Sequence, residues 1–263
     1  MSVLQAYDLR ELIKDPIRRP FPLQRNERFE YILPENNGLQ EDLDTLYEFT
    51  NAKQLIIKEK KTHLMKFNFS NSHDFPPEIK IKGFSENIGV VSKTKLLGVI
   101  ISNELKWNAN TEYICNKAYK KLWIIRRLKA LNLEPSFLLD VYVKEVRSIL
   151  ELAVPAWHGS LTDKLSRELE RVQKVAVRII IGKHVSYTAA LKRLNLDSLY
   201  DRREKLCRKF AEKTLKSRHS DIFVRNNTLH ETRFKQKFKH PFCNTGRYFN
   251  SPVNFLTRLL NED

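Results

Sequence analysis

Apolar residues recur at helical spacing through the middle of the chain, and this periodicity constrains the fold more than any other sequence feature. Between residues 108 and 218, Ile, Leu, Val, Ala and Phe return every three or four positions, which places them on one face of an α-helix. Only 7 of the 263 residues are glycine, which disfavours a turn-rich barrel or propeller. The sequence therefore predicts a mostly helical fold.

Start and stop signals divide this region into helices. Pro135 suits a first helical position, and Pro155 ends the helix that Pro135 begins. Ser160 and Asp163 form a capping-box-like pair before a second apolar stripe, which Gly182 closes. A further helix is expected at about 198–217.

The region before residue 108 mixes helical and strand patterns. Leu39, Leu43 and Leu46 follow helical spacing, whereas residues 62–69 alternate between polar and apolar, as a half-buried strand does. Further short strands are expected at 78–82, 88–91 and 96–101. The predicted fold class is α+β, mostly helical, with a small antiparallel sheet followed by a helical bundle and a basic tail.

Four segments follow from these patterns: a helix near 3–14 with a Pro-rich connector (1–38), the mixed segment (39–107), the helical segment (108–218) and a basic aromatic tail (219–263). The tail is expected to form a short helix near 252–260. Its alternating Lys/Arg and Phe/Tyr side chains could stack on unpaired bases. Docking of these aromatic side chains onto the bundle is an equal alternative.

Composition excludes several classes of protein. No apolar run approaches the roughly 18 residues that span a bilayer, and residues 1–15 hold three acidic side chains where a signal peptide has an apolar core. Cys115, Cys207 and Cys243 are far apart and form no CxxC pair, which argues against a zinc site and for reduced, structural thiols. An intracellular location, cytoplasmic or nuclear, is expected.

The charge points to an anionic partner. Lys and Arg number 47 against 31 Asp and Glu, for a net charge of +16 and an isoelectric point near 9.7. Nucleic acid is the first candidate and an anionic membrane surface the second. Between residues 202 and 241, 13 Lys/Arg face 4 Asp/Glu, so 13 − 4 = +9 of the excess lies there.

The sequence shows no recognisable catalytic site. A two-metal site needs clustered carboxylates, but Asp is scarce, and Asp42 and Asp44 with Glu41 fit a solvated helix face better. No GxSxG, P-loop, GxGxxG or HExxH motif occurs, and no His has a partner at ligand spacing. We therefore predict no catalytic residue, no metal ligand and no cofactor.

Three helical runs carry bases suited to phosphate contacts. The run after 163 holds Lys164, Arg167, Arg171, Lys174 and Arg178, but the interleaved Glu168 and Glu170 favour an ordinary solvated face. Between 202 and 218 only Glu204 and Glu212 offset eight bases, which favours phosphate binding there. The residues predicted to contact nucleic acid in these runs are Lys120, Lys121, Arg126, Arg127, Arg171, Lys174, Arg178, Arg202, Arg203, Arg208 and Lys209.

Several stretches resemble non-LTR (LINE-type, jockey-like) retrotransposon reverse transcriptases. Lys60-Lys61-Thr62-His63-Leu64-Met65-Lys66-Phe67 is similar to the KTxxMxF strand of that family. Thr94-Lys95-Leu96-Leu97-Gly98-Val99-Ile100 with Leu105-Lys106-Trp107 is similar to its YLGV…LxW hairpin. The stretch Arg147 to Trp157, followed by Leu169-Glu170-Arg171-Val172-Gln173-Lys174 and Arg178-Ile179-Ile180, resembles its helical thumb. The resemblance covers residues 39–217.

This resemblance implies roles for particular residues. Leu97, Gly98 and Val99 would form the primer grip, which positions the growing DNA end. The helices from 108 would form the thumb, which holds an RNA or DNA template–primer duplex by its backbone without reading its sequence. Lys61 would lie on the palm near incoming phosphates.

Departures from the family pattern bear on catalysis. The Y/F-x-D-D strand, whose aspartates bind Mg²⁺ in the family, does not occur in the sequence and is expected directly before Met1. Lys58 stands where the family often has Asn, Leu96 where it has an aromatic residue, and Asn110-Thr111 where it has His. The resemblance thus implies a reverse transcriptase fragment, the end of the palm plus the thumb, without polymerase activity.

Two other hypotheses stay open. The chain could become active only when another chain supplies the missing half, so that mixing with a fingers–palm fragment would restore activity. It could also be a helical scaffold or interaction protein whose basicity is incidental.

The first prediction concerns catalysis. The purified chain is expected to incorporate no nucleotide into a template–primer with Mg²⁺ or Mn²⁺, because no other group replaces the metal-binding aspartates. Incorporation of labelled nucleotide, measured beside an active reverse transcriptase, checks this. Incorporation by the chain alone would contradict it.

Overall fold

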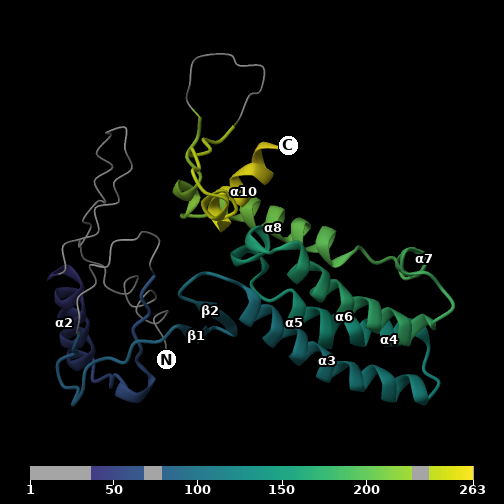
Figure 1. Ribbon diagram of the computed structural model, residues 1–263, viewed down its shortest axis with the longest axis horizontal. Coiled ribbons are helices and arrows are strands. Elements are labelled where there is room, and N and C mark those ends of the chain that lie inside the picture. The colour runs from purple at the N-terminus through teal and green to yellow at the C-terminus, as the bar shows by residue number, and fades with distance from the viewer. Residues whose placement is uncertain (1–36, 68–78, 227–236, 263) are drawn as a thin grey trace. The chain divides into compact units, whose positions relative to one another are not determined.

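The structure is a computed structural model that describes residues 37–67, 79–226 and 237–262. These residues are mostly helical, with one two-stranded antiparallel sheet (Figure 1), which confirms the predicted α+β, mostly helical class. One compact unit holds the described residues up to Leu97 together with Ile101–Leu105, and a second holds Gly98–Ile100 with those from Lys106 onward. The helix expected near 3–14 lies outside the described residues.

The first unit is organised by α2 (Asn37–Ala52), which confirms the helix expected from the spacing of its leucines. Leu43 and Tyr47 of α2 pack on a small core made by Ile79, Ile81, Phe84 and Ile88. A 3₁₀ turn, Glu59–Lys61, follows α2. The unit's core is therefore a short extended stretch covered by one helix.

The strands expected at 62–69, 78–82 and 88–91 are wrong within the described parts of those ranges. Leu64 forms only an isolated parallel bridge with Val90. A turn at 82–83 and a bend at 85–86 interrupt the extended chain between the ranges. Leu64, Ile79, Ile81 and Ile88 from these ranges pack in the core beneath α2. These apolar side chains are therefore at least partly buried without a continuous ladder of paired strands.

The sheet is a single hairpin of β1 (Lys93–Leu96) and β2 (Val99–Ser102). The strand expected at 96–101 is therefore interrupted near its start. Leu97 and Gly98 form the turn with φ values of 46° and 89°, the positive values that the commonest two-residue hairpin turn requires at both positions.

Helices make up most of the second unit. They are α3 (Asn108–Ala130), α4 (Pro135–Val141), α5 (Ser148–Leu150), α6 (Asp163–Ile181), α7 (Tyr187–Arg193), α8 (Leu199–Leu215), α9 (Gly246–Phe249) and α10 (Pro252–Asn261). Pro135 is the first residue of α4, as predicted, and a π-helical stretch, Tyr142–Arg147, joins α4 to α5. Short 3₁₀ turns follow at Val154–Ala156, His158–Ser160 and Ser220–Ile222.

The caps of α6 were predicted in part. Thr162, and not Ser160, caps its first turn, because the Thr162 hydroxyl accepts a hydrogen bond from the Leu165 amide. Gly182 ends the helix as predicted, with φ of 110°. α7 was not predicted, because a helix of seven residues is too short to give a clear periodic pattern.

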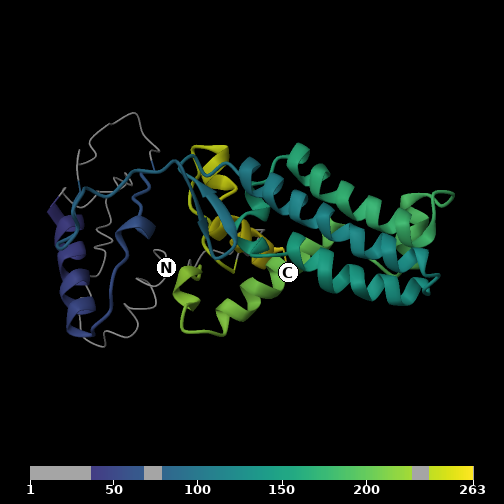
Figure 2. The same ribbon diagram turned by 90° about the horizontal axis from the view of Figure 1, so that it is seen from below.

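The core of the second unit lies between α3, α6 and the α4–α5 stretch, which run side by side (Figures 1 and 2). Ala118 of α3 and Ala176 of α6 are fully buried, and their small side chains let the two helices approach closely. α10 packs against α8, which confirms the helix expected near 252–260. The described part of the basic tail therefore belongs to the helical unit.

A core substitution tests this packing. Leu169→Ala is expected to lower the free energy of unfolding by about 2–5 kcal/mol, because the buried side chain has no exposure and leaves a cavity. Leu131→Ala is the matched control, since Leu131 is 70% exposed, and should change stability by less than about 0.5 kcal/mol. Urea titration measures both, and equal effects would contradict the assigned core.

Candidate nucleic-acid interface

Five basic side chains lie along one face of α6. Lys164, Arg167, Arg171, Lys174 and Arg178 follow one another at steps of three or four residues, and all are exposed. At 1.5 Å per residue the row is about 21 Å long. Three of them belong to the set predicted to contact nucleic acid, and Lys164 and Arg167, which that set omits, extend the row.

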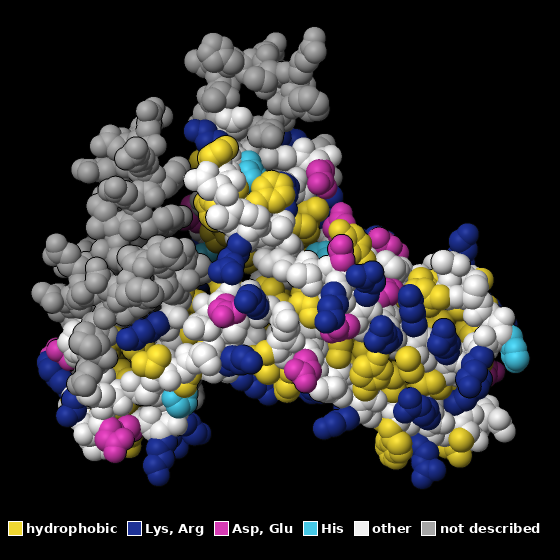
Figure 3. All heavy atoms as spheres, in the orientation of Figure 1, with side chains coloured by type: hydrophobic (Ala, Val, Ile, Leu, Met, Phe, Trp, Pro, Cys, Tyr) yellow, Lys and Arg dark blue, Asp and Glu magenta, His cyan; other side chains and the backbone are white. Residues whose placement is uncertain are grey.

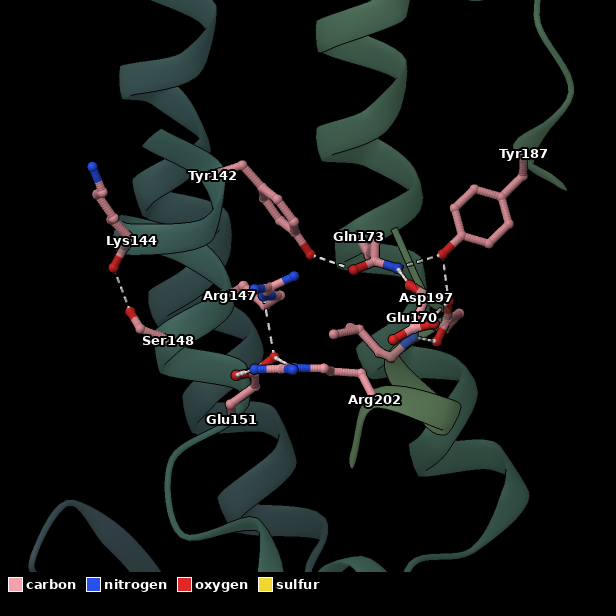
Figure 4. A network of polar contacts seen from close by, with 11 residues as sticks. Tyr142, Lys144, Arg147, Ser148, Glu151, Glu170, Gln173, Tyr187, Asp197 and Arg202 are labelled. Carbon is pink, nitrogen blue, oxygen red and sulfur yellow. Dashed lines mark hydrogen bonds and ion pairs between the residues drawn. The ribbon is translucent and has the colours of Figure 1, made fainter. Parts of the chain in front are cut away.

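Glu170 points away from this row into the junction of α6, α7 and α8 (Figure 4). Its carboxylate accepts hydrogen bonds from the Tyr187 hydroxyl and from the Leu199 amide, the latter at 3.0 Å. Burial, and next the bond to Glu170, raise the pKa of Tyr187, so the phenol remains a donor at neutral pH. The half-buried Glu170 is therefore hydrogen-bonded within the protein and does not pair with the row of bases.

Gln173 extends this buried network (Figure 4). Its amide oxygen accepts from the Tyr142 hydroxyl at 2.6 Å, and its amide nitrogen donates to the Tyr187 hydroxyl and to the Asp197 carbonyl, each at 2.9 Å. The network links the α4–α5 stretch to α6 and α7. Since every member has a partner, it holds α6 in one rotation about its axis.

Glu168 lies on the flank of α6 that faces α3. It is half-buried, and its charge adds to burial in raising the pKa values of Cys115 and Tyr119. Glu170 is therefore removed from the row of bases, whereas Glu168 borders the row, one helical turn after Lys164. The outer face of α6 is thus mainly basic, with the half-buried Glu168 at its edge, and the expectation of an ordinary solvated face stays untested.

α3 runs parallel to α6. Near the C-terminal ends the Lys129 ammonium donates to the Ile180 carbonyl at 3.1 Å, and nearer the N-terminal ends Tyr119 lies close enough to Glu168 and Arg171 for their charges to shift its pKa. α3 and α6 contact each other, and both also contact α4. Their outer faces, which are turned away from α4, therefore open on the same side of the pair.

The outer face of α3 carries an aromatic residue among bases. Lys120, Trp123 and Arg127 follow helical spacing and are exposed, and the Arg127 guanidinium carbon lies 6.0 Å from the centre of the Trp123 ring. Arg126 is exposed on the flank toward α6. We call these four residues and the five bases of α6 the α3–α6 face.

The α3–α6 face is strongly cationic. Lys and Arg side chains gather around an apolar area over the part of the view where Figure 1 places α3, α4 and α6 (Figure 3). Within the described part of the chain, none of the eight bases of this face forms an ion pair with a carboxylate. The Lys174 ammonium nitrogen instead lies 5.2 Å from the centre of the Tyr187 ring.

Two of the predicted bases of α8 are occupied inside the protein. Arg202 pairs with Glu151 at 3.0 Å (Figure 4). Arg208 donates to the Leu259 carbonyl at 2.8 Å and pairs with Glu262 at 3.2 Å. These contacts tie α8 to the α5 end and to α10, so both bases have a structural role already.

Arg203 does not reach the surface. It is 1% exposed, and it donates to His158 Nδ1 at 3.3 Å and to the Ser166 hydroxyl at 2.7 Å. Burial lowers the pKa of the guanidinium. Because a buried side chain cannot contact a phosphate, the prediction that Arg203 binds nucleic acid is wrong.

The other predicted helical bases lie apart from the α3–α6 face. Lys121 pairs with Glu145 at 2.9 Å. Lys209 is exposed on the outer side of α8 with Lys213 and Lys216, where Glu212 shares their side. The outer side of α8 therefore presents the mixed charge that the sequence suggests for α6.

The residues suggested by the family resemblance lie in the first unit and in the hairpin. Lys61 is exposed at the end of the 3₁₀ turn. At the tip of the hairpin Leu97 is 73% exposed, whereas Val99 is buried. A Cβ on Gly98 would lie 3.0 Å from Leu152 Cδ2, and the positive φ also favours glycine.

No metal centre is found among the described residues, where no three His, Cys, Asp or Glu side chains gather suitably. All three cysteines are free thiols. Burial raises the pKa of Cys115 to about 11 and that of Cys207 to about 12. Both are protonated at neutral pH and are poor nucleophiles or ligands.

Comparison with known proteins identifies no relative: no family model, no curated protein and no solved structure matches the chain. In the part of the chain that the structure describes, no helix is both long and apolar enough to cross a membrane.

The His158–Arg203 contact predicts a pH dependence of stability. Burial, and next the charge of Arg203, lower the pKa of His158 from 6.5 to about 4. As the pH falls from 6.5 toward 4, the unfolded chain binds a proton that the folded chain does not, so the free energy of unfolding decreases. The slope from this residue is at most about 1.4 kcal/mol per pH unit.

His158→Gln should remove this contribution while a side-chain acceptor for Arg203 remains. His184→Gln, at an exposed position, is the control for the loss of one imidazole. Urea titrations at a series of pH values measure the slopes. An unchanged slope in His158→Gln would show that the histidine is not held neutral.

Proposed function

We propose that the chain binds nucleic acid through the phosphate backbone, without reading sequence, and that the α3–α6 face makes the contact. The observation that carries the proposal is the row of five bases on α6, which no carboxylate of the described residues pairs. Bases of this kind give sequence-independent affinity because their contacts go to phosphates alone.

The dimensions of the row suit a nucleic-acid strand. Phosphates of one strand recur about every 3.4 Å along a duplex axis, so a row of about 21 Å runs past about six of them. If the five bases neutralise five phosphates, the logarithm of affinity falls with that of salt with a slope of about −4.5.

The family resemblance supplies the expected ligand. A thumb holds the template–primer duplex by its backbone, and the helices from 108 are those that resemble a thumb. We propose that the chain is a reverse transcriptase fragment that retains template–primer binding and takes no cofactor. Binding without catalysis distinguishes this function from a polymerase.

A charge-reversal pair tests the proposal. Arg167→Glu, Arg171→Glu and Lys174→Glu together should weaken binding of a blunt duplex at least about tenfold and flatten the salt slope by about 2.7, because three phosphate contacts disappear. The control, Lys209→Glu with Lys213→Glu and Lys216→Glu, makes the same change in net charge on α8. Fluorescence polarisation at several salt concentrations measures both.

The outcomes separate three hypotheses. A strong loss of duplex affinity in the α6 variant, with little loss of affinity in the α8 control, supports the proposed face. Equal loss in both would mean that net charge alone drives binding. Retained binding in the α6 variant, or no binding by the wild-type chain, would contradict the proposal and favour a helical interaction or scaffold protein.

A further inference from the structure

Trp123 differs from the other two tryptophans of the chain in its exposure. Trp107 is 8% exposed and Trp157 is 1% exposed, but Trp123 is 59% exposed. It lies in the middle of α3, where the inner face is well packed. A large aromatic ring left in water on a rigid helix is a candidate contact for a partner.

The neighbours of Trp123 indicate the chemistry of that partner. Lys120 and Arg127 are one helical turn before and after it, and the Arg127 guanidinium lies 6.0 Å from the ring centre. Arg126 is the adjacent exposed base. An apolar protein surface would have to desolvate these three charges, whereas a polyanion would satisfy them, so charge complementarity favours nucleic acid.

We propose that the α3–α6 face binds single-stranded nucleic acid in addition to duplex, with Trp123 stacking on an unpaired base while the α6 bases hold the backbone. This inference rests on the proposed function and adds an unpaired strand to the ligands of the same face. Within a duplex each base is covered by its neighbours, so only an unpaired base can offer its face to the ring. Aromatic rings beside a cationic groove bind single strands in this manner.

Substitution of Trp123 tests the inference with two ligands. Trp123→Ala should weaken binding of a short oligothymidylate about tenfold, the scale of one lost base–aromatic stack, and change binding of a blunt duplex by less than about twofold. Trp123→Phe keeps an aromatic ring and should retain single-strand affinity within about threefold. Since the side chain is exposed, circular dichroism of both variants should match the wild type.

Intrinsic fluorescence gives an independent readout. Because the other two tryptophans are buried, oligothymidylate should quench mainly the Trp123 emission. Trp123→Phe should bind the oligonucleotide with the quenching lost. The α6 charge-reversal variant should bind neither ligand well.

Each outcome bears on one of the two claims. If Trp123→Ala binds oligothymidylate as tightly as the wild type, or if saturating oligonucleotide leaves the wild-type emission unchanged, the stacking inference is wrong. Equal losses on single strand and duplex would also overturn it. If instead the α6 variant binds both ligands like the wild type, the proposed function itself fails.

Discussion

The hydrogen bonds that Glu170 accepts from Tyr187 and from the Leu199 amide determine how the helical unit presents its charge. They hold the Glu170 carboxylate at the junction of α6 with α7 and α8. On the same side of α6, Gln173 accepts a hydrogen bond from the Tyr142 hydroxyl. With the rotation of α6 set in this way, its bases all face outward. The cationic face therefore depends on a partly buried contact of an acidic side chain.

Charge on the surface is consequently distributed differently from charge along the sequence. The densest excess, +9 between residues 202 and 241, includes bases of α8 that Glu151 and Glu262 pair and one that is buried. The α6 run looks balanced in sequence but is unbalanced on its outer face. The position of the candidate site therefore depends more on which bases the carboxylates pair than on net charge.

Periodicity and caps predicted helical structure from residue 108, the start of α4 at Pro135 and the end of α6 at Gly182, because these signals are local in the sequence. The strands near Leu64 and Val90 were mispredicted because Leu64 and Ile88 pack beneath α2, and Leu64 and Val90 meet only in an isolated bridge. The burial of Arg203 depends on His158, which lies 45 residues away, and helical spacing cannot reveal such a contact. The α6 row was available from spacing alone, but the direction in which each glutamate points was not.

The resemblance to a reverse transcriptase thumb and the geometry of the α3–α6 face lead to one central claim, that nucleic acid lies across α3 and α6. Acetylation footprinting of lysines, with and without saturating template–primer, tests it most directly. The account predicts protection of Lys120, Lys164 and Lys174 with unchanged reactivity at Lys209, Lys213 and Lys216. Protection of the α8 lysines while Lys164 and Lys174 stay reactive would contradict it.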